Sequence, residues 1–142
     1  MKRYRFPLEP VLRVRLIEQD AARAALVAAH HGFRVADDAR HRTVARYRAL
    51  PVDAGAETTD RWLARRTASH RTAACVVAAE ADTEAARARM DDQRSALQQA
   101  RMRTSALERL DGRRREEHEL ESRRAEDAEV DELVTARHGR HS

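Results

Sequence analysis

This 142-residue chain has very few residues that would interrupt an α-helix, with only three prolines and four glycines. Pro7 and Pro10 stand near the start, and proline is tolerated in the first turn of a helix. Pro51 lies nearer the middle, and Gly55 follows it closely. The sequence therefore predicts an all-α fold of two long antiparallel helices that form an elongated coiled-coil hairpin, with a turn at residues 51–59.

The two expected helices are unequal in length. The first covers about residues 10–50 and the second about residues 60–136, and together they form a single domain over residues 1–142. Thr58 and Asp60 follow the turn, where their side-chain oxygens can accept hydrogen bonds from the backbone N–H groups at a helix start. We therefore place the start of the second helix at this point.

Large apolar side chains are also scarce. Alanine supplies much of the 42% apolar fraction, aromatic residues make up 4%, and charged residues make up 37%. This balance is typical of long helices and coiled coils and is poor material for a closed catalytic cleft. Disorder is the alternative for so charged a composition, and the periodicity of the sequence argues against it.

Each expected helix carries a stripe of mainly apolar or small residues in alternating steps of three and four, which we call its seam. The first seam consists of Leu8, Leu12, Arg15, Gln19, Ala22, Leu26, Ala29, Phe33, Ala36, Arg40, Thr43, Tyr47 and Leu50. The second consists of Trp62, Arg65, Ser69, Thr72, Val76, Ala79, Thr83, Ala86, Met90, Gln93, Leu97, Ala100, Thr104 and Leu107. This spacing keeps one face of each helix toward a partner in a left-handed coiled coil.

The two seams have nearly equal spans, residues 8–50 and 62–107, as an antiparallel pairing requires. Beyond Leu107 the same register meets charged side chains, beginning with Asp111 and His118. We therefore expect the second helix to have no partner within the chain from about residue 108 onward, and to form a C-terminal overhang.

The overhang is expected to depend on local ion pairs, namely Arg115 with Glu119 and Glu119 with Arg123, each worth a few tenths of a kcal/mol. Gly112 lies where the overhang begins and should weaken the helix by roughly 1 kcal/mol. A few apolar residues along the overhang indicate a surface that another protein completes. The alternative is a solvated helix that frays.

Basic and acidic residues are unevenly distributed along the chain. Residues 1–50 hold 11 basic and 5 acidic residues, whereas residues 111–142 hold 7 basic and 10 acidic residues. The net charge is +4, the isoelectric point is about 10.1, and Lys2 is the only lysine. Nucleic-acid binding is a weak inference, because acidic residues are interleaved with the basic ones and aromatic residues are few.

The sequence offers no set of residues for catalysis. Cys75 is the only cysteine and lies in an apolar run, so we interpret it as a small packing residue. His30 and His31 fall on different helix faces, and no group of residues has metal-ligand spacing. No glycine-rich phosphate loop occurs. We expect no enzymatic activity, no catalytic residues, no cofactor and no metal.

The longest apolar runs are far shorter than a membrane span, and the amino-terminal residues lack the apolar core of a signal peptide. We therefore expect a cytoplasmic protein without a transmembrane segment.

Segments at the two ends resemble the FliJ family of flagellar type III export proteins. Residues 4–15, Tyr-Arg-Phe-Pro-Leu-Glu-Pro-Val-Leu-Arg-Val-Arg, are similar to the family opening Phe-x-Leu-Glu-x-(Val/Leu)-Leu-x-(Val/Leu/Ile)-Arg. Residues 107–110, L-E-R-L, precede an Arg/Glu-rich segment and then V-D-E-L at residues 130–133, which looks like the family's carboxyl-terminal pattern. The order, the spacing and the total length agree with the family.

This resemblance implies an antiparallel two-helix coiled coil that is similar to the central stalk of rotary ATPases. It implies a non-enzymatic activator of the hexameric export ATPase that also contacts the membrane export gate and the export chaperones. Such a protein would be cytoplasmic and peripherally associated with the membrane at the flagellar base. The end with both termini would enter the ATPase ring, and the turn near residues 50–62 would point toward the gate.

The residues that the resemblance implies for the ring contact are Phe6, Leu8, Leu12, Leu107, Leu110, Arg113, Arg114, Asp131, Glu132 and Leu133. For Leu8 and Leu12, plain packing in the seam is the simpler interpretation. The chain departs from the family at Gly112, Pro7 and Pro10. The alternative function is that of a basic coiled-coil protein that binds nucleic acid or acts as a scaffold or adaptor.

Overall fold

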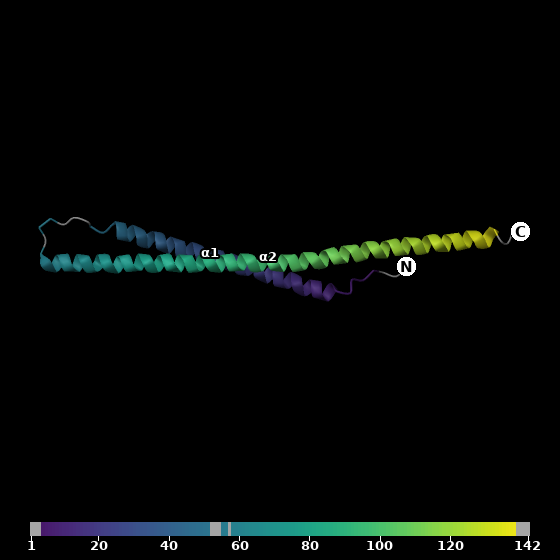
Figure 1. Ribbon diagram of the computed structural model, residues 1–142, viewed down its shortest axis with the longest axis horizontal. Helices are drawn as coiled ribbons and strands as arrows, with labels where there is room; N and C mark the ends of the chain where they lie inside the picture. The colour runs from purple at the N-terminus through teal and green to yellow at the C-terminus, as the bar shows by residue number, and fades with distance from the viewer. Residues whose placement is uncertain (1–3, 52–54, 57, 139–142) are drawn as a thin grey trace. The chain divides into compact units, whose positions relative to one another are not determined.

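The computed structural model describes residues 4–51, 55–56 and 58–138, and it contains two long helices packed against each other as a hairpin (Figure 1). Helix α1 covers Glu9–Arg48 and helix α2 covers Thr59–His138. No strand occurs among the described residues. The predicted all-α hairpin is therefore confirmed, and the observed helix ends differ by no more than two residues from those expected.

The helix ends follow from local hydrogen bonding. The Leu8 carbonyl accepts from the Leu12 N–H at 2.9 Å, so α1 begins with Pro10 in its first turn, where the missing N–H leaves no bond unmade. At the other end of α1, the Leu50 N–H donates to the Tyr47 carbonyl at 3.2 Å and tightens the last turn. Helix α2 begins where the Thr58 carbonyl accepts from the Trp62 N–H at 3.0 Å.

The chain forms two contact units, each of which contains part of both helices. The terminal unit combines residues 1–19 with residues 100–142, and the turn unit covers residues 20–99.

One contact in each unit shows the direction of pairing. In the terminal unit, Thr104 Oγ1 lies 3.5 Å from the carbonyl oxygen of Arg15. In the turn unit, Thr83 Oγ1 lies 3.3 Å from the carbonyl oxygen of Ala36. The contact residue on α1 changes from Arg15 to Ala36, while the contact residue on α2 changes from Thr104 to Thr83. The two steps have the same length, three whole heptads, and opposite directions. The helices therefore pair antiparallel, and the contacting residues are predicted seam positions on both helices.

Burial follows both seams closely. Every predicted seam position is buried or half-buried except Tyr47 and Trp62, which are each 42% exposed. The most deeply buried seam side chains are Thr104 at 3%, Leu97 at 6% and Ala86 at 8% exposure. A buried leucine contributes about 1.5–3 kcal/mol, whereas an alanine contributes much less. The core is therefore a narrow line in which many small contributions add up.

Gly112 does not interrupt α2, which continues through it with ordinary backbone angles. No atom lies within 4 Å of the position that a β-carbon would occupy there, and the same holds for Gly32 in α1. Gly112 therefore lowers the helix propensity at this position, as expected, but α2 is not broken there.

We predict that Gly112→Ala raises the stability of the chain by about 1 kcal/mol, because alanine loses less backbone entropy in a helix and meets no obstacle here. Thermal unfolding followed by circular dichroism at 222 nm measures the change. Gly32→Ala is the matched control in the turn unit and should shift the midpoint in the same direction. A lower midpoint for Gly112→Ala would contradict the open surroundings of this residue.

Candidate functional site: the terminal unit

The residues before α1 pack against α2 and extend the helix pairing. We call residues 4–8 the N-terminal arm. The Tyr4 hydroxyl donates to Asp111 Oδ1 at 2.8 Å, and the Tyr4 ring lies 5.6 Å from the His118 ring, tilted by 59°. The expectation that α2 has no partner from residue 108 onward is therefore wrong as far as His118, because the arm accompanies the helix up to that residue.

Arg115 completes this contact. Its Nη2 lies 3.1 Å from Asp111 Oδ2, and its guanidinium lies 5.7 Å from the centre of the Tyr4 ring. The predicted pairing of Arg115 with Glu119 is wrong. The Arg115 guanidinium instead pairs with Asp111, which lies one helical turn before Arg115 and whose carboxylate is only 20% exposed. The other predicted pair, Arg123 with Glu119, is present at 3.7 Å.

Phe6 anchors the arm and is 7% exposed. Its carbonyl accepts from the Glu9 N–H at 3.2 Å, which joins the arm to the first turn of α1. Asp111 and His118 occupy the positions that continue the seam of α2, so the arm fills the place of a partner helix. The signal in the sequence was the pair of aromatic residues, Tyr4 and Phe6, just before a helix start.

The structure places the ten predicted contact residues in three groups. Leu8, Leu12, Leu107 and Leu110 are half-buried, and Phe6 is buried, all within the terminal unit. Arg113, Arg114, Asp131 and Glu132 are exposed on α2. Leu133 also lies in α2, with its side chain outside the described residues.

The carboxyl-terminal part of α2 is exposed and acidic. Beyond Ser122, every side chain that the structure describes is exposed. Residues 116–132 contain nine acidic residues and two arginines. Two apolar residues stand out in this segment, Leu120 at 51% and Val130 at 58% exposure. This part of α2 is a charged helix with a sparse apolar surface and no described partner within the chain.

Other chemistry is limited in the described part of the chain. Cys75 is exposed, so our interpretation of it as a packing residue is wrong. The half-buried positions near it are Thr72, Ala73, Val76 and Ala79. No group of three histidine, cysteine or acidic side chains that could hold a metal occurs among the described residues. Neither described helix has a segment long and apolar enough to cross a bilayer.

The surroundings of Tyr4 change its acidity. Partial burial of the phenol raises the pKa of Tyr4 above its ordinary value, and the hydrogen bond to Asp111 and the charge of that carboxylate raise it further. The positive charges of Arg115 and Arg114 act in the opposite direction and are outweighed.

Two long helices packed as a hairpin, with an exposed acidic segment at the end of α2, form the architecture of helical interaction proteins. The family model described as Flagellar FliJ protein matches residues 4–142, and the chain belongs to this family. No curated protein and no solved structure was found to match it. The chain is therefore a non-catalytic component of the flagellar type III export apparatus.

The acidity of Tyr4 provides a test of the arm contact. The chain has two tyrosines, so in Tyr47→Phe the tyrosinate absorbance reports Tyr4 alone. We predict a midpoint above pH 10.0, and a shift back toward that value when Asp111→Asn is added. Because the pKa is higher in the folded chain, the stability that the Tyr4 contact contributes is fully present below pH 10 and is lost as the pH rises through the folded pKa. Equal midpoints with and without Asp111→Asn would disprove the contact.

Proposed function

We propose that this chain is a central-stalk-like coiled coil that binds and activates the hexameric export ATPase. It couples the ATPase to the export gate and to the export chaperones, and it acts in the cytoplasm at the membrane face of the flagellar base. The terminal unit enters the ring. One domain over the whole chain carries these contacts.

The observation that carries this proposal is the change in α2 near Ser122. Before this residue the helix has partners on its seam, and after it every described side chain is exposed. A long charged helix gains little from its own ion pairs, since exposed pairs contribute about 0–1 kcal/mol each. Leu120 and Val130 are exposed apolar side chains on this charged helix, and in this proposal the partner protein covers them together with the acidic residues.

The ten residues act in two ways in this proposal. The half-buried and buried ones hold the terminal unit together, because they are already packed against the chain itself: Phe6, Leu8, Leu12, Leu107 and Leu110. The exposed arginines and the acidic segment of α2 face the ring, and they include Arg113, Arg114, Asp131, Glu132 and, by its position, Leu133.

The proposed mechanism is mechanical. A single asymmetric rod inside a ring of identical subunits contacts each subunit differently, so the subunits become inequivalent. This favours ring assembly and sequential turnover without any chemistry on the rod. The alternative of nucleic-acid binding has less support, because the exposed part of α2 beyond Ser122 carries mainly acidic side chains, which phosphate groups repel.

We predict that Arg113→Glu combined with Arg114→Glu weakens stimulation of the purified export ATPase by about tenfold or more, the effect of losing an important interface contact. Both residues are exposed, so the helix content should not change. The matched control is Arg101→Glu with Arg103→Glu, which makes the same charge change at two exposed positions of α2. If both double variants stimulate the ATPase equally well, the proposed ring contact is wrong.

A further inference from the structure

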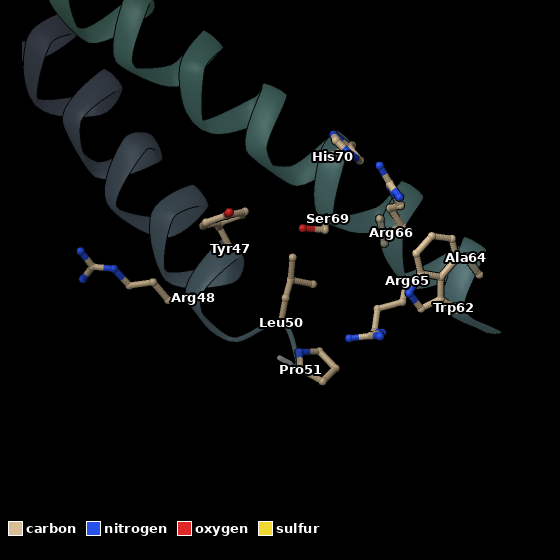
Figure 2. A pocket seen from close by; sticks show the side chains of 11 residues that line it. Tyr47, Arg48, Leu50, Pro51, Trp62, Ala64, Arg65, Arg66, Ser69 and His70 are labelled. Atoms are coloured by element: carbon tan, nitrogen blue, oxygen red, sulfur yellow. The ribbon is translucent and has the colours of Figure 1, made fainter. Parts of the chain in front are cut away.

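A groove lies between the end of α1 and the start of α2, within the turn unit, and we call it the turn-end groove. It has a volume of about 800 Å³. Tyr47 and Leu50 form one side, and Trp62, Arg65 and Ser69 lie on the other (Figure 2). This volume falls within the range of about 300–1,000 Å³ that is typical of ligand pockets.

The aromatic residues of this groove depart from the pattern of the seams. Tyr47 and Trp62 hold seam positions, yet they are the two seam residues that stay exposed, at 42% each. Leu63, next to Trp62, is 50% exposed. Two aromatic rings at positions that are buried elsewhere along the same helices offer unused apolar contact area. Tyrosine and tryptophan are the residues most enriched in protein-binding surfaces.

Positive residues outnumber acidic ones around the groove. The segment Arg42–Arg71 holds seven arginines and three acidic residues, so it alone accounts for the net charge of +4 of the whole chain. Among the described residues of the lining, the charged or titratable side chains are Arg48, Arg65, Arg66 and His70, and none of these is a carboxylate. The lining therefore offers a positive field to whatever enters the groove.

Arg48 and Arg66, like most of the described arginines, form no ion pair with any described residue. Arg66 lies over the Trp62 ring at 5.2 Å from its centre, which orders the ring and leaves the positive charge uncompensated. The groove thus combines open aromatic surface with positive charge.

We propose that the turn-end groove is a docking site for an acidic amphipathic helical segment of a partner protein. Leucine-like side chains of that segment enter between Tyr47 and Trp62, and its carboxylates face Arg65 and Arg66. This is the helix-in-groove mode of recognition, in which apolar anchors give affinity and charges give specificity.

The concave shape decides between a protein segment and other anionic partners. A bilayer surface is flat and cannot enter a groove between two helices. A nucleic acid would place phosphates on the arginines but has no aliphatic side chain for the space beside Leu50 and Ser69. A helix with leucines on one face and glutamates around them satisfies both features. The inference rests on this groove alone and is independent of the ring contact proposed above.

The test uses the full chain and a synthetic helical peptide of about 18 residues, roughly five turns, with leucines on one face and glutamates elsewhere. The chain has one tryptophan, so its emission reports the groove directly. We expect the peptide to bind and to shift the emission of Trp62 to shorter wavelength. Peptides with lysine in place of glutamate, or serine in place of leucine, should bind at least about tenfold more weakly.

Two variants test the two features of the groove, with the anisotropy of a labelled peptide as the readout. Arg65→Glu with Arg66→Glu reverses the charge, and Ser69→Phe fills the space without a charge change. Each should weaken binding by about tenfold or more, while stimulation of the export ATPase is retained. The matched control is Arg87→Glu with Arg101→Glu, at two exposed positions outside the groove, and it should bind normally.

Several results would overturn the proposal. Equal binding of the lysine peptide, or unchanged binding in both groove variants, would remove the basis in charge and shape. A shift of Trp62 emission with vesicles rich in phosphatidylglycerol, but not with the peptide, would assign the groove to a lipid surface. Self-association of the chain in sedimentation velocity that Arg65→Glu with Arg66→Glu abolishes would make the occupant a second copy.

Discussion

The contact between two alanine-rich seams is the interaction on which the rest of this structure depends. Small side chains let the backbones of α1 and α2 approach closely, and the hydroxyl groups of Thr104 and Thr83 reach carbonyl oxygens of the opposite helix. Few large apolar side chains are buried, so register is specified by the repeat as a whole and not by one dominant cluster. The register in turn decides where the pairing ends.

The consequences appear at the ends of the pairing. In the terminal unit, the arm continues the contact from α1 and brings Tyr4 onto Asp111 and His118. Beyond Ser122 no described residue covers α2, and the helix is exposed and acidic. In the turn unit, Tyr47 and Trp62 remain open around a positively charged groove. The described chain thus has two chemically different exposed surfaces, one acidic and one basic.

The periodicity of the sequence was sufficient to predict the fold class, the direction of pairing and two seams whose positions, except Tyr47 and Trp62, are buried or half-buried. It failed where a contact does not follow from hydrophobicity. Asp111 and His118 are polar, so the register gave no reason to expect a partner, and only the arm supplies one. Cys75 lies in an apolar run yet faces outward, because an alanine-rich helix has apolar residues on several faces. The assignment of residues to partner contacts stays a proposal, because packing within the chain does not identify which exposed residues a partner touches.

Hydrogen exchange followed by mass spectrometry, with and without the export ATPase, shows directly whether the ATPase covers the end of α2. We predict slow exchange in α2 up to about His118 and fast exchange beyond Ser122 in the free chain, with the fast segment becoming protected when the ATPase is added. Protection beyond Ser122 in the free chain would contradict the unaccompanied helix end. Fast exchange there in the presence of a bound ATPase would contradict its role as the surface that the ring covers.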